Sequence, residues 1–295
     1  WAWLRHLDLE RRFGVGFDVG APDTGGNNEQ VRDTAVTTSS SSSGIRLTPP
    51  SIEVSLALRV DSATAVPADA TIIGSFVAAG GPIDERLGVD RAQLELNGFE
   101  GKVGTSMLVT ALDGVARTAI GSGTGELGVA AARDAAAAFG RAAGKHVDLA
   151  IVAPASEISV EALAQALVEG ILLSRYTFDA LRSDPKGTPV ESITVIVADE
   201  ADVDAAKAGA QRGRAFAAAT KLSRDLANSP HSHLSASMLA ELALQIGPSR
   251  GLEIEIFGEE ELREMGCGGI LGVNAGSVEP PRMIKMTYRP EGEPT

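Results

Sequence analysis

The chain has 295 residues, of which 44% are hydrophobic and 22% charged, with a formal net charge of −13. The apolar content is enough for a sizeable core and excludes a chain that is disordered throughout. The acidic balance argues against nucleic acid or an anionic membrane as partner, because both attract clustered Lys and Arg. No run of the sequence approaches the roughly 18 apolar residues needed to span a bilayer. The single cysteine, Cys267, fits a reducing compartment, so we expect a cytoplasmic location.

Residues 1–51 have the composition of an extension without a stable fold. They open on Trp1 rather than Met, and their Ser/Thr run at residues 37–43 buries too little surface to offset the cost of ordering. Six acidic residues stand against five arginines, whereas transit peptides contain few acids. We therefore expect a disordered or mis-set amino-terminal extension and assign it no function.

Residues 52–200 alternate short apolar strands with helices, which is the pattern of an α/β domain. Strands are expected at residues 52–60, 70–78, 106–110, 116–120, 147–153 and 192–197, and helices at residues 87–96, at 130–143 and after a Ser159 cap. The Asp113-Gly114 pair predicts a tight hairpin between the third and fourth strands. The almost wholly apolar run 147–153 is typical of a parallel strand covered on both faces.

Residues 201–295 start a second α/β unit with a linker helix at about residues 204–226. A second helix is expected from the Ser235 cap to residue 246, where Gly247-Pro248 stops it. Strands are expected at residues 253–257, 269–273 and 283–288, with a short helix at residues 259–265. So few strands would leave open sheet edges and an uncovered face, so we expect this second unit to be incomplete.

A glycine pattern precedes the helix at residues 130–143. Gly123, Gly125 and Gly128 match G-x-G-x-x-G, whose backbone N–H groups can hold a pyrophosphate, and Asp148 follows at the expected remove. The match fails in detail, because the ribose-binding acid belongs at the end of the second strand and Asp148 is expected at its beginning. A plain strand-to-helix turn is the favoured interpretation, with nucleotide binding as the alternative.

Three further groups are weak candidates for chemistry. His231 and His233 could bind a metal, but no carboxylate or cysteine stands at a fitting spacing, so a polar loop is favoured. Cys267 has no identifiable base and is interpreted as a small buried residue beside a strand. The acidic run at residues 259–261 is interpreted as the solvated first turn of a helix, where acids are stabilised. These residues alone do not specify a reaction.

The run Ser223-Arg224-Asp225-Leu226-Ala227-Asn228-Ser229-Pro230 resembles the "ARDLVNTP" junction of leucyl aminopeptidases, the M17 family of cytosolic metallopeptidases. Other matching stretches follow in the family's order, at residues 252–257 with 259–266, at 269–277 with 280–282, and at 284–288. Upstream, Glu169-Gly170 with Tyr176 and Phe178 resembles the helix that closes the family's amino-terminal domain. The resemblance covers about residues 52–290. Ser229 in place of the family's Thr is a mild departure.

This resemblance implies a macro-like α/β amino-terminal domain over residues 52–200 and a larger α/β catalytic domain, assembled as a homo-hexamer. It also implies an enzyme that removes amino-terminal residues, with leucine preferred, from peptide substrates by means of two divalent metal ions, manganese or zinc. The family's motifs "GKG…FDSGG" and "NTDAEGR", which carry the catalytic and metal-binding residues, do not occur in the sequence. No catalytic, metal or cofactor residue is therefore assigned, these residues are expected beyond Thr295, and the 295-residue chain is expected to be inactive.

Two alternatives from other classes remain. The macro-like domain could be a non-catalytic module that binds ADP-ribose or another nucleotide, with residues 121–128 as its phosphate loop. It could also act only in oligomer assembly and regulation. Some bacterial relatives bind DNA, but the acidic balance argues against that activity in this chain.

Overall fold

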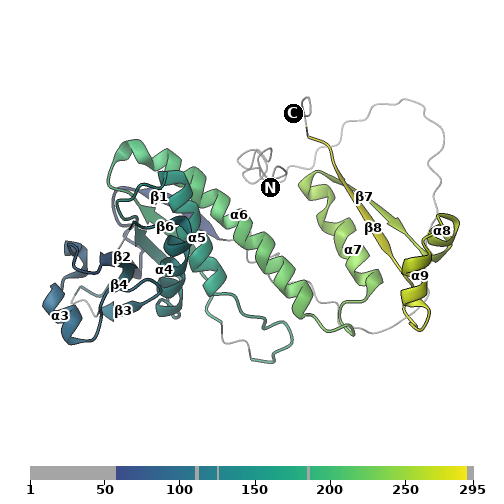
Figure 1. Ribbon diagram of the computed structural model, residues 1–295, viewed down its shortest axis with the longest axis horizontal. Helices are drawn as coiled ribbons and strands as arrows, with labels where there is room; N and C mark the ends of the chain where they lie inside the picture. Colours follow the sequence, from purple (N-terminus) through teal and green to yellow (C-terminus); the bar gives the residue numbers. More distant parts are fainter. Residues whose placement is uncertain (1–57, 110–112, 125, 185–186, 291–295) are drawn as a thin grey trace. The chain divides into compact units, whose positions relative to one another are not determined.

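A computed structural model describes residues 58–109, 113–124, 126–184 and 187–290 (Figure 1). Within these residues one compact unit ends at Ser229 and a second begins at Pro230. The domain boundaries predicted at residues 51 and 200 stay predictions. Residues 1–57, including most of the strand predicted at 52–60, lie outside the described part of the chain.

The first unit is built on a six-stranded sheet in the order β1-β6-β5-β2-β4-β3. Its strands are β1 (Arg59–Ala63), β2 (Ile72–Ala78), β3 (Ser106–Val109), β4 (Ala116–Gly123), β5 (Asp148–Val152) and β6 (Ser192–Ile196). Neighbouring strands are parallel except β3 and β4, which are antiparallel. The predicted α/β class and the antiparallel pairing across Asp113-Gly114 are therefore confirmed.

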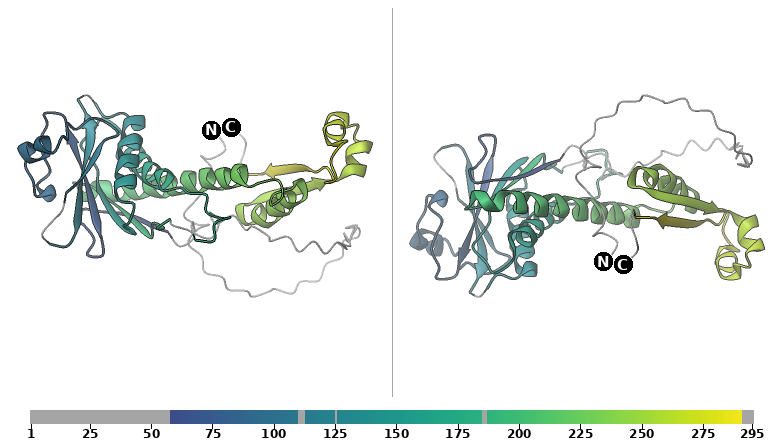
Figure 2. Two further views of the ribbon diagram at one scale, coloured as in Figure 1. Left: turned by 90° about the horizontal axis from the view of Figure 1, so that it is seen from below. Right: turned by 90° about the horizontal axis from the view of Figure 1, so that it is seen from above.

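Three helices cover one face of this sheet: α4 (Val129–Ala142), α5 (Val160–Ser174) and α6 (Val203–Asn228) (Figure 2). The large side chains between sheet and helices, such as Ile120, Phe139 and Leu167, are fully buried.

The opposite face is covered by the 3₁₀ turn η2 (Glu85–Leu87) and α3 (Arg91–Leu96), where Leu87 and Leu94 pack on Val77. Next to them, Val66 and Ala70, in the link from β1 to β2, pack on Ile73, Ala150 and Ile196.

Local signals explain most of these boundaries. The Ser159 side chain accepts a hydrogen bond from the Ala162 amide at 3.3 Å, so the predicted cap is confirmed. The single helix predicted at residues 87–96 is wrong, because the chain turns at Gly88 with φ at 67° and restarts at Asp90. Asp90 caps α3 in a reciprocal capping box with Gln93, and that box begins a separate helix.

The helices of the first unit approach one another closely through small residues. A Cβ on Gly209 of α6 would overlap the carbonyl oxygen of Glu161 in α5. A Cβ on Gly213 would lie 2.7 Å from the carbonyl oxygen of Gln165, and one on Gly170 of α5 would overlap the carbonyl oxygen of Arg133 in α4. Helix α6, predicted as a linker, is therefore packed as an integral part of the first unit.

The second unit contains α7 (Ala236–Ile246), η4 (Pro248–Arg250), β7 (Leu252–Phe257), α8 (Glu259–Glu264), α9 (Gly268–Asn274) and β8 (Met283–Tyr288). Strands β7 and β8 pair antiparallel. The apolar side chains that are buried in its described part are Ala240, Leu262 and Pro281, whereas Val273 and Val278 are almost fully exposed. This unit therefore has a very small core.

The strand predicted at residues 269–273 is wrong, because these residues lie in helix α9. Gly266, with φ at 72°, ends the turn after α8, and the Leu271 amide then bonds to the Cys267 carbonyl at 3.2 Å. A short apolar run cannot distinguish strand from helix by periodicity alone. Cys267 is partly exposed at the start of α9, so its predicted burial beside a strand is also wrong. None of the helices described has the length and apolar character needed to cross a membrane.

Candidate functional site

A cavity of about 720 Å³ lies at the carboxyl ends of three adjacent strands, β5, β2 and β4. Its walls come from the ends of these strands and from the segments that follow them. The lining residues are Phe76, Ala78, Pro82, Ile83, Asp84, Ser122, Glu126, Leu127, Val152, Ala153, Pro154, Ala155, Ser156 and Glu157. This volume lies within the range of small-molecule sites, which is roughly 300–1,000 Å³.

The connections between the strands explain why a cavity forms at this edge. After β2 the chain passes to η2 and α3 on one face of the sheet, whereas after β4 and β5 it passes to α4 and α5 on the other face (Figure 2). Where neighbouring strands send the chain to opposite faces, a crevice opens at their carboxyl ends, and ligands of open α/β sheets bind in such crevices.

The cavity combines apolar walls with carboxylates. Phe76, Ile83 and Leu127 are among its apolar residues, and Asp84, Glu126 and Glu157 are its acids. The hydroxyl of Ser156 in the wall has no hydrogen-bond partner among the described residues, which is uncommon for a polar atom shielded from solvent. The lining therefore carries negative charge and one hydroxyl group, that of Ser156, that can still form a hydrogen bond.

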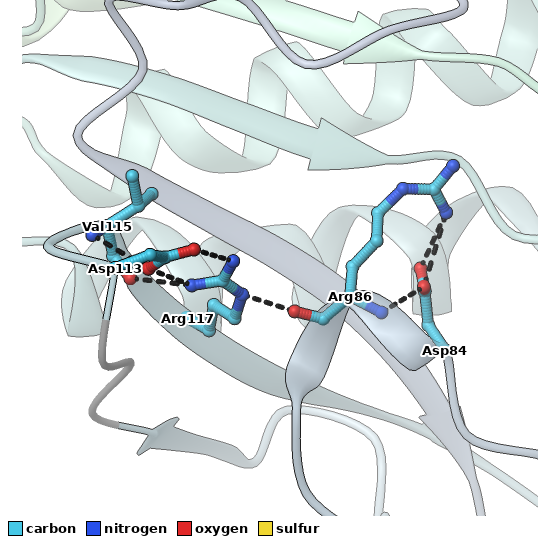
Figure 3. Close-up of polar contacts among 5 residues, drawn as sticks. All are labelled: Asp84, Arg86, Asp113, Val115 and Arg117. Carbon is cyan, nitrogen blue, oxygen red and sulfur yellow. Dashed lines mark hydrogen bonds and ion pairs between the residues drawn. The ribbon is translucent and has the colours of Figure 1, made fainter.

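A chain of polar contacts holds the wall that follows β2 (Figure 3). Asp84 accepts hydrogen bonds from the buried Ser75 hydroxyl at 3.1 Å and from the Arg86 amide at 2.9 Å, and the Arg86 guanidinium lies 3.1 Å from its carboxylate. The carbonyl oxygen of Arg86 in turn accepts a hydrogen bond from Nε of Arg117 in β4. The same guanidinium donates hydrogen bonds to both carboxylate oxygens of Asp113, at 2.7 and 2.5 Å. This wall is thus tied to both β2 and β4.

We expect the pKa of Asp113, which is paired with Arg117, to lie far below that of an ordinary aspartate. The hydrogen bond from Arg117 and that from the Val115 amide lower the pKa of Asp113 from 3.8 to about 2. Because the folded-state pKa is depressed, the pair stabilises the fold above pH 3.8, and this contribution is lost as the pH falls toward 2.

An NMR titration of the side-chain carboxyls should place the Asp113 midpoint near pH 2, and Arg117→Met should raise the pKa of Asp113 toward 3.8 while the Val115 amide still holds it below that value. Arg141→Met removes an exposed guanidinium elsewhere in the same unit and should leave that midpoint unchanged. An ordinary midpoint for Asp113 in the unmodified protein would contradict the bidentate contact.

The glycine pattern is a plain strand-to-helix turn in the residues that are described. Gly123 ends β4 with φ at 84°, and Gly128 precedes α4 without a side-chain cap; Gly125 lies outside the described residues. Asp148 is the first residue of β5, where it accepts a hydrogen bond from Ser192 at 2.5 Å and lies 3.6 Å from Arg59. Because β4 and β5 run in the same direction, Asp148 lies at the amino ends of the strands and Gly123 at their carboxyl ends.

The other candidates do not gather into a site. His231 is exposed, and His233 shares a hydrogen bond with the neighbouring Ser232 at 2.9 Å. The acids at residues 259–261 are exposed in the first turn of α8, as predicted. Within the described part of the chain, His, Cys, Asp and Glu side chains form no group of three or more that could hold a metal ion.

Two of the motifs that carry the family resemblance meet in space. The Tyr176 hydroxyl donates to the buried Asp225 carboxylate at 2.9 Å and accepts from the Asn228 amide at 3.0 Å. The Arg224 guanidinium lies 5.4 Å from the centre of the Tyr176 ring. Nearby, burial lowers the pKa of Lys221, while Asp225 raises it by charge and Arg175 and Arg224 lower it. The segment after α5 and the end of α6 are therefore joined by an ionic cluster centred on the buried Asp225 carboxylate.

The cavity acids were not found from the sequence. Their signal was present, however, because Asp84 and Glu157 each follow a buried strand by a few residues, just after Pro82 and Pro154. Side chains after parallel strands meet at one edge of the sheet, so this placement could have been predicted once the strand order was known.

The fold places the chain among mixed α/β proteins, and comparison with family models makes the placement specific. Residues 76–185 match the cytosol aminopeptidase family, N-terminal domain, and residues 221–295 match the cytosol aminopeptidase family, catalytic domain. The chain therefore belongs to the cytosol aminopeptidase family.

Curated relatives agree with this result. A probable cytosol aminopeptidase of Mycobacterium ulcerans is 39% identical over 162 residues, which is 54% of this chain and 30% of the relative. One from Mycobacterium bovis is 37% identical over 143 residues, or 48% of this chain and 27% of the relative. The matched region thus spans less than a third of the length of these relatives.

Solved structures support the same fold. The bottromycin maturation enzyme BotP in complex with Mn is 30% identical with a TM-score of 0.64, and the match covers 75% of this chain and 46% of that enzyme. A mutant of tomato leucine aminopeptidase has a TM-score of 0.65 at 19% identity, covering 80% of this chain and 52% of that protein. The second similarity concerns the fold alone.

Proposed function

We propose that this chain acts as the amino-terminal part of a leucyl aminopeptidase, a hydrolase that removes amino-terminal residues from peptides. The observation that carries this proposal is the order of the two matches, an amino-terminal domain at residues 76–185 followed by the beginning of a catalytic domain at residues 221–295. We also propose that the protein is cytoplasmic and assembles as a homo-hexamer, as the family resemblance implies.

Divalent metal ions, manganese or zinc, belong to the proposal, and the Mn in the BotP structure supports this part of it. When bound, such ions activate water and stabilise the oxyanion that develops during peptide hydrolysis. The described residues do not fit a metal site, because no group of three suitable ligands gathers among them. Because the family's "GKG…FDSGG" and "NTDAEGR" motifs do not occur in the sequence, we propose that the metal-binding and catalytic residues lie outside residues 1–295, and we derive no reaction step from this chain.

The polypeptide of residues 1–295 is expected to show no hydrolysis of leucine p-nitroanilide above a blank that contains Mn²⁺ alone. The same protein extended through a Gly-Lys-Gly motif and a following Phe-Asp-Ser/Thr-Gly-Gly motif is expected to hydrolyse it, and a chelator should abolish that activity. Reading the codons after Thr295 supplies the extension. Turnover by the 295-residue polypeptide, or metal-independent turnover by the extended one, would contradict the proposal.

The alternative of an ADP-ribose or nucleotide module is not better supported. A phosphate site needs cationic groups or free backbone amides, whereas the described lining of the cavity supplies the carboxylates of Asp84, Glu126 and Glu157. Of these, Asp84 has a cationic neighbour, Arg86, and that guanidinium is already engaged with it.

A further inference from the structure

We propose that the cavity at the carboxyl ends of β5, β2 and β4 binds a small organic cation, a molecule with an apolar body and a protonated primary amine. The cavity has the volume of a small-molecule site and lies where open α/β sheets bind ligands. The chemistry of its lining selects the kind of ligand.

The apolar part of the ligand is recognised by the apolar side chains that line the cavity. Phe76, Ile83, Leu127 and Val152 line the cavity, and Leu127 is itself buried. An aliphatic group placed against them leaves water, which favours binding by roughly 25 cal/mol for each Å² of apolar surface removed. A ligand without an apolar body would forgo this contribution.

The charged part is recognised by two uncompensated carboxylates. Glu126 and Glu157 line the cavity from the segments that follow β4 and β5, and both are exposed. Neither forms an ion pair with a described residue, in contrast to Asp84, whose charge is balanced by Arg86. Two negative charges at one opening attract an ammonium group and repel a phosphate or carboxylate.

Three ligands with the same branched carbon body test the proposal on the full 295-residue chain. Isothermal titration with 3-methylbutylamine should give saturable binding, whereas 3-methylbutan-1-ol should bind about tenfold more weakly or not at all. The anion 3-methylbutanoate should not bind. Equal binding of the amine and the alcohol, or no binding of the amine, would overturn the proposal. Tighter binding of ADP-ribose than of the amine would also overturn it and identify a phosphate site.

Variants of the chain locate the bound amine. Glu126→Gln/Glu157→Gln should weaken amine binding by about tenfold, as expected when two partly solvated ion pairs are lost. Glu260→Gln/Glu264→Gln removes the same charge from exposed positions on α8 in the second unit and should leave the affinity unchanged. Equal weakening by both pairs would show general attraction to an acidic protein, and the proposal would then fail.

A third variant tests the cavity rather than the charge. Ala155 is exposed and lines the opening, so Ala155→Phe fills space without disturbing the core. It should abolish amine binding while both glutamates are retained. Far-UV circular dichroism checks that each variant is folded, and the three-ligand comparison on the unmodified chain stands independently of the variants.

Discussion

Gly209→Ala is expected to lower the free energy of unfolding of the first unit by about 2 kcal/mol. The new Cβ would overlap the carbonyl oxygen of Glu161 and lie 2.8 Å from its carbonyl carbon, so α5 and α6 would have to separate. In an open helix the same substitution stabilises by roughly 0.5–1 kcal/mol, because glycine loses more backbone entropy on folding. The close helix packing therefore reverses the sign of the effect.

Urea unfolding followed by far-UV circular dichroism measures this change. Ala208→Ser is a matched control, since it adds one heavy atom at the adjacent, exposed position of α6 and should cost no more than about 0.5 kcal/mol. If Gly209→Ala were as stable as the unmodified chain, or more stable, the helices could not pack at the distance described.

Asp225→Ala is expected to cost about 3 kcal/mol, because it removes a buried carboxylate that balances the charge of neighbouring cations. Asp225 is 3% exposed, accepts the Tyr176 hydroxyl at 2.9 Å, and raises the pKa of the partly buried Lys221. Without it, the Lys221 charge stays buried beside Arg175 and Arg224, which destabilise that charge further.

A second substitution separates this charge effect from a simple loss of packing. Asp225→Ala/Lys221→Met should recover a substantial part of the lost stability, because the stranded charge is then absent. Asp204→Ala, an exposed acid near the start of the same helix, should change stability by no more than about 0.5 kcal/mol.

The titration of Tyr176 provides an independent measurement of the same cluster. Burial is the main cause of its raised pKa, and the hydrogen bond and charge of Asp225 raise it further. The pKa of Tyr176 should therefore fall in Asp225→Ala. An unchanged pKa for Tyr176, together with unchanged stability, would show that Asp225 is not part of the cluster.

Patterns that depend on neighbouring residues were predictable from the sequence. The apolar run at residues 147–153 contains β5, the Ser159 hydroxyl caps α5, and Asp113-Gly114 lies between two antiparallel strands, all as expected. The run around Asp225 pointed to the family because it resembles the family's motif and other matching stretches follow in the family's order. Each of these features depends on residues that are close together in the sequence, so it can be predicted from the sequence.

Some local features were mispredicted because the competing signals were equally local. The run at residues 269–273 is apolar and short, which suits a buried strand and a helical turn alike, and α9 forms there. The prediction of one helix at residues 87–96 did not take Gly88 and the Asp90–Gln93 capping box into account. Gly88 ends η2, and the capping box begins α3.

By itself, the sequence determined the α/β class, most of the helices and strands, and membership of the cytosol aminopeptidase family. Only the tertiary structure decided that the strand order is β1-β6-β5-β2-β4-β3, and this order separates Asp148 from the glycine turn and places Asp84, Glu126 and Glu157 around one cavity. It also decided that Gly209 lies against Glu161, 48 positions away in the chain. The physical reason is that strand order and helix contact depend on which apolar faces cover one another, and residues distant in sequence share that burial.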